Sequence, residues 1–424
     1  MKNLYEKLLD AKKFECDSRS ISEGDVFFAL KGKNNDGHDF LSEVFKKGAL
    51  YAIISEEEKK KEGCIVVDDV YKTLYGLAKY KKQFIKKPMI AITGSAGKTT
   101  TRDLIVSILS KKYKVGSNKK NFNSNISLPL QILNLENECD IFVFEIGATR
   151  PGDIKFKCDL LNPDYGIITN VGNMHLETFG SREKIFETKT ELYDYVKKNE
   201  GVVFINYSQK KLIEKADSLE IKKKLYQFNN NNFVSFEKED PMVWYRCNEK
   251  IFKTNLFGKY QIDNIASAYA IGKYFEVSES NIHDAIQNYM PKDNRSEKIL
   301  TQKNNSIILD AYNANFDAII SGLKTFGTIN SKNKIVILGS MRELGIESES
   351  LHKKIGEELK KLRFKDVILL GEEMRFAKKK CNESFFLKSK DELILFLINK
   401  KYCDSYFFIK GARFWGLEEI VKYL

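Results

Sequence analysis

The chain has 424 residues, 42% of them hydrophobic and 12% aromatic, which is enough for packed cores and excludes an intrinsically disordered protein. This length predicts two or three domains. The formal net charge of +12 comes mostly from lysines spread along the chain, without the arginine and aromatic clusters typical of nucleic-acid-binding proteins, so we expect no nucleic-acid partner.

Cysteine use and the absence of long apolar runs indicate the compartment. The seven cysteines are scattered and never spaced as C-x-x-C, which favours free thiols over a disulfide framework or a zinc site. The first residues, "MKNLYEKLLDAKKFECD", lack the apolar core of a signal peptide, and no apolar run approaches the length of a membrane span. We therefore expect a cytoplasmic protein with no membrane insertion.

Residues 1–87 are predicted to form a small α/β domain. Two strand-like pieces, "DVFFAL" and "YAIIS", are joined to the rest by polar turns that contain glycine. A lysine-rich helix, "YKTLYGLAKYKKQFIKK", then leads to Pro88. Because proline interrupts a helix, the first domain boundary is placed there.

A glycine-containing loop follows in "MIAITGSAGKTT", at residues 89–100. The strict phosphate-loop pattern requires its first glycine two positions before Gly94, so that pattern is not met. Gly94 and Gly97 still permit a tight turn whose N–H groups face an anion, at the positive end of a helix that begins at Thr99. Lys98 would reach the outer phosphates, and the Thr99 hydroxyl would contact Mg²⁺. The alternative is an ordinary strand, turn and helix with a solvent-facing lysine.

Residues 88–292 alternate strands with helical stretches, which predicts a mostly parallel sheet. The strands are "IFVFEIG", "YGIITNVG" and "GVVFIN". Ligands bind such sheets at the carboxyl ends of strands, where Glu145 and His175 follow two of them. A carboxylate and an imidazole at this edge could hold a divalent cation against phosphate oxygens. The alternatives are a capping or ion-paired carboxylate and a surface histidine.

Residues 293–424 continue the alternation of strand and helix. The strands "KIVILGS", "KDVILLGE" and "SYFFIKGA" each reach a glycine, and "ESLHKKIGEELKKL" is a predicted helix between them. No G-x-G-x-x-G follows a strand, so we expect neither a nicotinamide nor a flavin site.

These motifs together resemble the Mur ligases of peptidoglycan synthesis over nearly the full length. "TGSAGKTT" is similar to the family's nucleotide loop, and "NFNSNISLPL", "FEIGATRPGDI" and "TNVGNMHLETFGS" follow in the family's order. The amino-terminal "DSRSISEGDVFFALKGKNNDGHDF" is similar to the family's nucleotide-sugar-binding domain. "LDAYNAN", "LGSMRELG" and "IKGAR" resemble the MurF type of the family, and "DAYNAN" is the most specific of them.

The resemblance implies three α/β domains and one reaction. Residues 1–87 would bind the UDP-MurNAc-peptide, 88–292 would form a parallel-sheet, P-loop ATPase domain, and 293–424 a Rossmann-like domain that receives a dipeptide. The γ-phosphate of ATP would move to the carboxylate of UDP-N-acetylmuramoyl-tripeptide. D-Alanyl-D-alanine would then displace phosphate from the acyl phosphate and form an amide. A monomer is expected.

The resemblance also implies roles for single residues. The nucleotide would be held by Gly94, Ser95, Ala96, Gly97, Lys98, Thr99 and Thr100, with Asn264 at the adenine, Asp310 at the ribose and Arg295 at the transferring phosphate. Thr99 and Glu145 would bind one Mg²⁺ ion, and His175 a second. Lys189 would carry a carbamate that completes the metal site, whereas its own sequence context predicts a solvated lysine on an amphipathic helix.

Substrate contacts are implied in the outer domains. Asp17, Ser18 and Arg19 lie in the motif that would bind the nucleotide sugar. Asn313, Asn315 and Arg413 would close over the ATP site and receive the dipeptide. At strand spacing, Asn313 and Asn315 would present both amides on one face.

Several positions depart from the family's pattern, and we expect them to alter contacts without removing the chemistry. The departures are Tyr260 and Gln261 in place of His-Asn, Phe316 in place of proline, Ser340 in place of aspartate, and Ser124 and Ser127 in place of asparagine and glycine.

Three other functions stay open. A sibling ligase of the MurE type would add a single amino acid, and "YNAN" argues against it. A folylpolyglutamate-synthetase-like ligase is disfavoured by the amino-terminal "DSR" motif. An inactive nucleotide-binding partner protein is disfavoured by the retention of Lys98, Glu145, His175 and Lys189.

Overall fold

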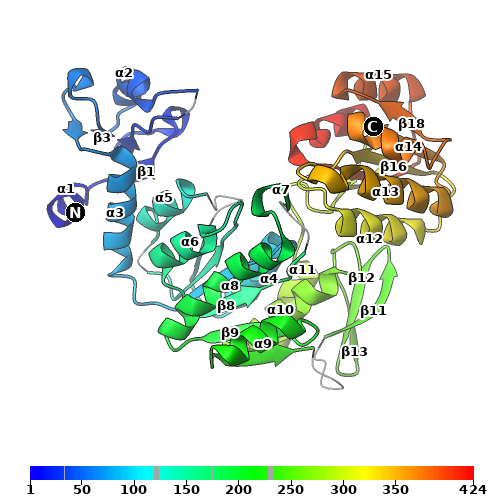
Figure 1. The fold of residues 1–424 in the computed structure, drawn as a ribbon, viewed down its shortest axis with the longest axis horizontal. Helices are drawn as coiled ribbons and strands as arrows, with labels where there is room; N and C mark the ends of the chain where they lie inside the picture. The colour runs from blue at the N-terminus through cyan, green and yellow to red at the C-terminus, as the bar shows by residue number, and fades with distance from the viewer. Residues whose placement is uncertain (33, 119–123, 137, 173–175, 228–233) are drawn as a thin grey trace.

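The computed structural model describes residues 1–32, 34–118, 124–136, 138–172, 176–227 and 234–424. In Figure 1, two smaller domains stand on the same side of a central domain, with the N-terminal domain at one end and the C-terminal domain at the other. The predicted class, three α/β domains built on parallel sheets, is confirmed. Within the described ranges, none of the helices combines the length and hydrophobicity that a membrane span requires.

The N-terminal domain is built on a four-stranded parallel sheet in the order β1-β2-β3-β4. Its elements are α1 (Lys2–Lys7), β1 (Phe14–Glu15), η1 (Ser18–Ser20), β2 (Val26–Phe28), η2 (Gly37–Phe40), α2 (Leu41–Lys46), β3 (Tyr51–Ile54), η3 (Glu57–Lys59), β4 (Cys64–Val66) and α3 (Val70–Lys82). Helix α3 ends five residues before the predicted end of this lysine-rich segment.

The central domain holds a six-stranded sheet in the order β10-β9-β8-β5-β7-β6, and every pairing in it is parallel. Its elements are β5 (Met89–Thr93), α4 (Lys98–Leu109), β6 (Val115–Ser117), α5 (Ser127–Leu133), β7 (Ile141–Glu145), α6 (Asp153–Leu161), β8 (Tyr165–Ile168), α7 (Leu176–Phe179), α8 (Arg182–Lys198), β9 (Val202–Asn206), α9 (Lys210–Ser218), β10 (Lys222–Tyr226), α10 (Gln261–Tyr274) and α11 (Glu279–Asn288).

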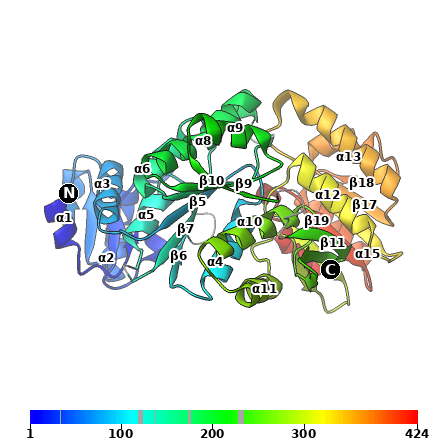
Figure 2. The same ribbon diagram turned by 90° about the horizontal axis from the view of Figure 1, so that it is seen from below.

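Helices cover both faces of this sheet, as Figure 2 shows. Alternate residues of β5 face opposite sides: Ile90 and Ile92 join the core under α4, α10 and α11, whereas Met89 and Ala91 join the core under α5, α6, α8 and α9. All five residues of β5 are buried, which explains its continuous apolar sequence. Because β5 lies between β7 and β8, its carboxyl end is the point where the strand order reverses, the usual ligand position in such sheets.

A three-stranded antiparallel sheet that the sequence analysis did not predict adjoins the central domain. It consists of β11 (Ser235–Asp240), β12 (Met242–Cys247) and β13 (Lys250–Lys253). Met242 and, after β13, Phe257 enter the core of the C-terminal domain. This sheet therefore links the two domains through apolar contacts.

The C-terminal domain contains a six-stranded sheet in the order β14-β15-β19-β16-β17-β18, parallel except for the β14 and β15 pair. Its elements are β14 (Glu297–Leu300), β15 (Ser306–Asp310), α12 (Phe316–Gly327), β16 (Lys334–Gly339), η5 (Gly345–Glu347), α13 (Ser348–Leu362), β17 (Asp366–Leu370), η6 (Glu372–Met374), α14 (Arg375–Lys378), β18 (Phe385–Leu387), α15 (Lys390–Lys400), β19 (Tyr406–Lys410), η7 (Arg413–Trp415) and η8 (Leu417–Tyr423).

Candidate active site

A cavity of about 610 Å³ opens at the carboxyl end of β5, between the central and C-terminal domains. It brings together predicted site residues that are far apart in the sequence. Those that line it are Ser95, Ala96, Gly97, Lys98, Thr99, Thr100, Glu145, Asn264, Arg295, Asp310, Asn313 and Asn315.

The loop after β5 has the conformation of an anion-binding turn. Gly94 (φ +147°) and Gly97 (φ +79°) adopt backbone angles that disfavour other residues, and a Cβ on Gly94 would lie 1.9 Å from the Thr169 hydroxyl. The N–H groups of Ser95 and Ala96 donate to the backbone and side-chain oxygens of Asn170. The donors that remain for an anion are therefore those of the first turn of α4, which helix geometry leaves unpaired.

Lys98 lies inside this turn and does not point to solvent. Its Nζ donates to the carbonyl oxygens of Gly94 at 2.8 Å and Ser95 at 3.2 Å. Burial lowers the pKa of the Lys98 ammonium, and Arg295 adds to this effect while Glu145 opposes it. The alternative, an ordinary turn with a solvent-facing lysine, is therefore wrong, since the Lys98 ammonium is bound within the loop.

Thr99 and Glu145 form a buried pair of oxygen donors. The Thr99 hydroxyl donates to Glu145 Oε2 at 2.6 Å, and both residues are buried. Asn118 fixes the end of β7 by bonding both the N–H and the carbonyl of Glu145. Arg102 Nη1 lies 3.7 Å from Glu145 Oε2, so this carboxylate is also ion-paired. Hard oxygen donors in this arrangement fit Mg²⁺.

Lys189, on α8, is 4% exposed, so the prediction of a solvated lysine is wrong. Burial, with a contribution from Lys98, lowers the pKa of the Lys189 amine to about 7. A buried amine with this pKa is unusual, although Lys189 is not among the residues that line the cavity. His175 lies outside the described residues.

Tyr260, Gln261 and Asn264 form the wall next to Gly97. Asn264 Oδ1 accepts from the Thr101 hydroxyl at 3.1 Å, and its Nδ2 donates to Gln261 Oε1 at 2.7 Å. A Cβ on Gly97 would lie 2.4 Å from Asn264 Oδ1, so this glycine allows the close approach. The two departures at Tyr260 and Gln261 therefore lie on the cavity wall, where altered contacts were expected.

The C-terminal domain contributes charges to the opposite wall. Asp310, at the end of β15, accepts from Lys410 Nζ at 2.5 Å, and Lys410 is 2% exposed. The guanidinium of Arg295 lies 3.8 Å from the centroid of the Tyr312 ring, and that of Arg413 lies 5.5 Å from the same centroid. Arg413 itself is exposed and is not among the lining residues.

Asn313 and Asn315 do not lie on a strand, so the prediction that strand spacing places both amides on one face is wrong. Strand β15 ends at Asp310, and α12 begins at Phe316. Asn315 is the N-cap of α12 and accepts from the Ala318 N–H at 2.8 Å, while Asn313 Oδ1 accepts from the Ala314 N–H. Both residues still line the cavity, because the turn into the helix directs the chain there.

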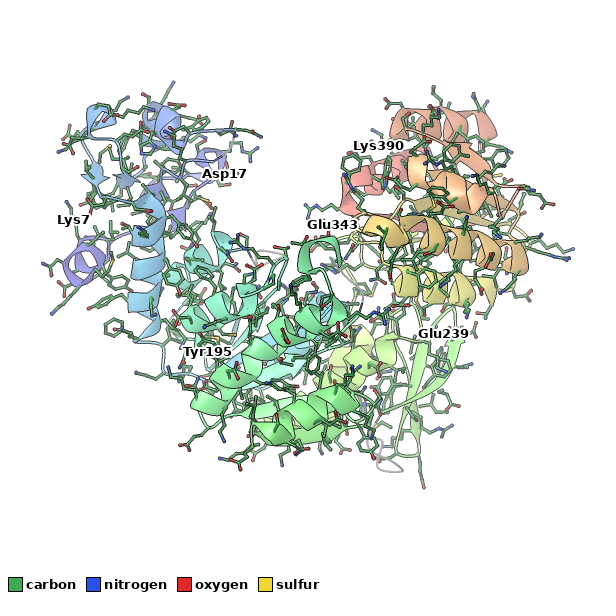
Figure 3. The ribbon with its side chains drawn as sticks, in the orientation of Figure 1. Lys7, Asp17, Tyr195, Glu239, Glu343 and Lys390 are labelled. Carbon is green, nitrogen blue, oxygen red and sulfur yellow. The ribbon has the colours of Figure 1, made fainter. Side chains whose placement is uncertain are left out.

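Asp17, Ser18 and Arg19 lie apart from this cavity, in the N-terminal domain. Figure 3 shows Asp17 on the side of its domain that faces the C-terminal domain. Asp17 is the N-cap of η1, and its carboxylate accepts from Arg19 Nε at 2.9 Å and Nη2 at 2.7 Å. The hydrogen bond from Arg19 is the main cause that lowers the pKa of Asp17 to about 2.

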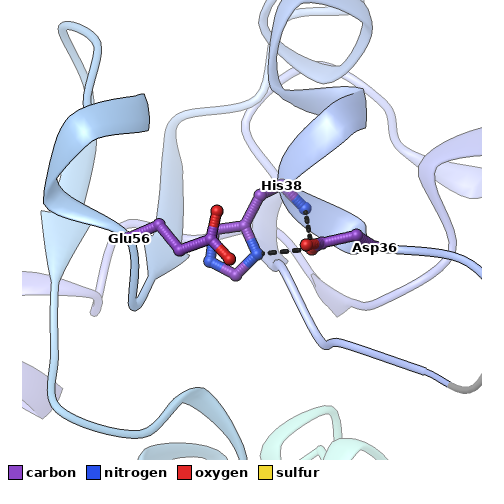
Figure 4. A group of neighbouring side chains, drawn as sticks. All are labelled: Asp36, His38 and Glu56. Atoms are coloured by element: carbon purple, nitrogen blue, oxygen red, sulfur yellow. Dashed lines mark hydrogen bonds and ion pairs between the residues drawn. The ribbon is translucent and has the colours of Figure 1, made fainter.

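A second cluster of titratable groups, Asp36, His38 and Glu56, lies elsewhere in the N-terminal domain (Figure 4). His38 Nε2 accepts from the Ser55 N–H at 3.0 Å, so its proton is assigned to Nδ1, which lies 2.6 Å from Asp36 Oδ1. Both ring nitrogens are therefore engaged within the protein. The cluster fastens the loop before η2 to the end of β3 and is not assigned as a metal site.

The cavity residues that the sequence analysis did not predict include Lys157, Tyr312 and Lys410. Lys410 was within "IKGAR" and Tyr312 within "DAYNAN", so both motifs pointed to the correct segments. Lys157 follows "FEIGATRPGDI" on α6 and had no motif of its own. A lysine on a helix is usually solvated, and only the packing of α6 shows that this one is buried.

Fold and site define a nucleotide-binding protein with a phosphate loop at the switch point of a parallel sheet and a second α/β domain across the cavity. Three family models match the chain: "Mur ligase family, catalytic domain" over residues 12–92, "Mur ligase middle domain" over 92–272 and "Mur ligase, glutamate ligase domain" over 294–411. The UDP-N-acetylmuramoyl-tripeptide–D-alanyl-D-alanine ligase of Bacillus subtilis (strain 168) is 31% identical over 422 residues, covering 96% of this chain and 91% of the relative. The chain belongs to the Mur ligase family.

Solved structures show the same similarity. A MurF structure from Acinetobacter baumannii superposes with a TM-score of 0.85 at 26% identity, covering 97% of this chain and 92% of that one. The MurF ligase from Thermotoga maritima in complex with ADP gives a TM-score of 0.83 at 25% identity, covering 98% and 97%. The E. coli (strain K12) ligase of the same name as the B. subtilis relative is 26% identical, covering 96% of this chain and 92% of that relative.

Proposed function

We propose that this chain is an ATP-dependent, ADP-forming ligase that joins D-alanyl-D-alanine to the carboxylate of UDP-N-acetylmuramoyl-tripeptide, in the cytoplasm. The observation that supports it most is the single cavity in which the phosphate loop of the central domain faces Asp310, Asn313 and Lys410 of the C-terminal domain. Full-length similarity to ligases named for this reaction points the same way.

The reaction needs two anions at bonding distance. A carboxylate oxygen attacks the γ-phosphorus of ATP, the bond to the bridging oxygen breaks, and ADP leaves with the electron pair. Lys98 and the first turn of α4 would bind the β- and γ-phosphates, and Arg295 would neutralise charge on the transferring group. Preorganised cations and N–H groups of this kind usually supply the largest part of such rate enhancements.

Mg²⁺ would bind at Thr99 and Glu145, with a second ion near His175 and Lys189, and would neutralise phosphate charge. A carbamate on Lys189 would turn a cation into an oxygen ligand. Carbon dioxide reacts with the neutral amine, and the pKa of about 7 leaves Lys189 half neutral at neutral pH. An ordinary lysine, with a pKa near 10.4, would be neutral in roughly 0.04% of molecules. The buried environment thus favours the modification.

The amine step would take place at the C-terminal wall. The amine nitrogen attacks the acyl carbon, phosphate leaves with the C–O electron pair, and the amine loses a proton. Asn313 and Asn315 each use Oδ1 within the protein, so their Nδ2 groups would be the donors toward the dipeptide. Arg413 would approach on closure, Asp310 would contact the ribose, and Asn264 the adenine. Water exclusion would protect the acyl phosphate.

Two further assignments belong to this proposal. Asp17, Ser18 and Arg19 would contact the nucleotide sugar, which the domain of residues 1–87 would bind. The domain of residues 88–292 would bind ATP, and the domain of residues 293–424 would receive the dipeptide. The protein would act as a monomer, since residues of one chain line the cavity from both domains.

A side-by-side assay tests the function. The purified protein is incubated with ATP, Mg²⁺ and UDP-MurNAc-tripeptide, and ADP formation is measured with D-alanyl-D-alanine, D-alanine, L-lysine or meso-diaminopimelate. We expect rapid ADP formation only with the dipeptide, because a site that pairs polar groups of the longer amine rejects shorter ones, by up to about 10⁴-fold. A better rate with a single amino acid would indicate a MurE-type enzyme, and no ADP with any amine would favour an inactive partner protein.

A further inference from the structure

Lys157 is a buried lysine on the wall of the active-site cavity. It lies on α6, is 4% exposed, and lines the cavity together with Lys98, Thr99 and Glu145. Its Nζ donates a short hydrogen bond to the carbonyl oxygen of Gly147, in the loop after β7. An ammonium group has three N–H donors, so this bond leaves two for another acceptor.

The charge of Lys157 lacks a dedicated partner in the described part of the chain, where no carboxylate forms an ion pair with it. Burial lowers the pKa of Lys157, and the positive charges of Lys98 and Arg150 lower it further. The negative charge of Asp153 partly offsets this effect, but the Asp153 carboxylate already accepts from the N–H and hydroxyl of Thr149 and from the N–H and Nε of Arg150. An anion in the cavity would relieve this cost.

Another buried lysine shows what a purely structural role looks like. Lys81, on α3, is 8% exposed, and its Nζ donates at 2.7 Å to two carbonyls, those of Leu133 and Leu135 at the carboxyl end of α5. It does not line the active-site cavity. Lys157 has one carbonyl acceptor and lines the cavity. Its ammonium group therefore leaves more N–H donors without an acceptor than the ammonium group of Lys81 does.

The position of Lys157 indicates which anion it meets. Lys98 and the anion-facing turn belong to α4, on one face of the central sheet, whereas α6 lies on the other face with α8, which carries Lys189. Helix α6 also packs against α3, the last helix of the N-terminal domain. Lys157 therefore reaches the cavity from the side on which a substrate held by the N-terminal domain would enter.

We propose that Lys157 is a further substrate-binding residue, whose ammonium donates hydrogen bonds to the reacting carboxylate of the peptide substrate and then to the acyl phosphate formed from it. This inference rests on the proposed ligase function. Lys157 stays protonated and forms no covalent bond. Two anionic species, the carboxylate and then the acyl phosphate, occupy the same place, so one cation serves both.

The test compares Lys157→Met with Lys157→Arg and with Lys155→Met, an exposed lysine on the same helix. The measured quantities are kcat/KM for UDP-MurNAc-tripeptide at saturating ATP, the Kd for ATP by calorimetry, and the Tm. Loss of a charged hydrogen bond predicts a fall in kcat/KM of about 10- to 100-fold for Lys157→Met. The Kd for ATP stays within about twofold, since phosphate binding rests on the other face of the sheet. Lys157→Arg keeps most of the activity and Lys155→Met keeps all of it.

The outcomes separate this inference from the function on which it rests. If the wild-type protein forms no ADP with these substrates, the proposed function fails first. If it is active and Lys157→Met loses ATP affinity and tripeptide use in the same proportion, Lys157 only supports the loop through Gly147, and the inference is wrong. An unchanged kcat/KM also overturns it. Should Lys157→Met not fold, the Lys157→Arg and Lys157→Gln pair is measured in its place, and equal kcat/KM values for the tripeptide would refute the role of charge.

Discussion

The central domain has two interfaces with other domains, and they differ in how much of the contact is apolar and how much is charged. The N-terminal interface continues the hydrophobic core: residues of β2 and α3 pack in one cluster with α5, α6 and α8. Directed hydrogen bonds fix its position. Asn134 accepts from the Phe14 N–H and donates to the Phe14 carbonyl, both at 2.8 Å, and Asp159 accepts from Tyr75 and Lys79 across the interface.

The C-terminal interface has a smaller apolar part and a larger charged part. Met242 and Phe257 enter the C-terminal core, where the rings of Phe257 and Phe408 lie 5.7 Å apart. Most of the remaining boundary is the cavity itself, with Lys98 and Glu145 on one wall and Asp310 and Lys410 on the other. The N-terminal interface therefore holds a domain in place, whereas the C-terminal interface contains the proposed active site. Substitutions at the first should change stability, and those at the second should change rates.

The largest effect is expected for Lys98→Ala. The variant removes the cation that phosphates would recruit from the Gly94 and Ser95 carbonyls, so turnover should fall by at least about 10³-fold. The fold should stay intact, because Lys98 is not part of an apolar core. Phosphate release measures the rate, and circular dichroism with the Tm controls for folding. Normal activity in the purified variant would remove the phosphate loop from the mechanism.

Lys189→Ala should be nearly as damaging. If Lys189 carries a carbamate, short-chain carboxylates in the buffer should restore part of the turnover by occupying the vacated ligand position. Wild-type activity should also depend on pH: with a pKa of about 7, the amine is protonated below neutral pH, so carbamate formation is lost as the pH falls and favoured above it. Initial rates after preincubation with and without bicarbonate, at pH 6 and pH 8, measure this. Near-normal activity of the variant without rescue would argue against the carbamate.

The sequence predicted elements more reliably than their contacts. The strand at 89–93 was recognisable because both of its faces are buried and it is apolar throughout, and the helix after it because its apolar residues recur at helical spacing. The antiparallel sheet at 235–253 was not predicted, since strands such as "SFEKED" are half exposed and polar. Local pattern does not reveal a strand whose stability comes from its neighbours.

For the site residues, too, local pattern predicted position better than it predicted burial and contacts. Lys98 and Glu145 were predictable because loop and strand end place them by local geometry. The burial of Lys189 and Lys157 depends on how α6 and α8 pack on the sheet, which is a long-range property. Asn315 shows the opposite error: its segment was interpreted as a strand, although Asn before Phe316 and Asp317 is also a helix N-cap, and the cap prevailed.

A smaller loss of rate is expected for Tyr312→Leu. The ring of Tyr312 holds the Arg295 guanidinium over its face, and cation–π contacts contribute about 0.5 to 2 kcal/mol. Turnover should fall about 3- to 30-fold while the Tm changes little. Tyr312→Phe is the matched control, because it keeps the ring and removes only the hydroxyl. If Phe and Leu variants lose the same activity, the hydroxyl matters and the stacking argument fails.

At the N-terminal interface, Asn134→Ala should lower stability without a proportional loss of rate. The variant leaves the N–H and carbonyl of Phe14 unpaired in a part-buried position, which costs about 1 to 3 kcal/mol for each such group. The free energy of unfolding in urea measures the effect. Asn134→Asp is the comparison variant, since it can still accept from the N–H but not donate to the carbonyl, and should lie between. A large fall in kcat with unchanged stability would contradict the division between the two interfaces.

The smallest effect is expected for Asp159→Asn, which tests the same interface at its exposed rim. Asp159 Oδ2 accepts from Lys79 Nζ at 2.7 Å and from the Tyr75 hydroxyl at 2.9 Å, and the hydrogen bond from Lys79 is the main cause that lowers the pKa of Asp159. The side chains of Lys79 and Asp159 are about half exposed, so water and salt screen their attraction.

The amide of the Asp159→Asn variant keeps an acceptor for Tyr75 and loses only the charge, which is worth about 0.2 to 1 kcal/mol at such a site. Because the folded pKa of Asp159 is lowered, its contribution is fully present above the unfolded pKa of about 3.9 and is lost progressively as the pH falls through the folded pKa. The difference between wild type and variant in urea unfolding should therefore shrink in 1 M salt and at pH 3, with kcat unchanged throughout. A salt-independent loss of several kcal/mol would mean that this exposed pair is part of the rigid attachment of the N-terminal domain. It would contradict the view that only the buried part of this interface determines stability.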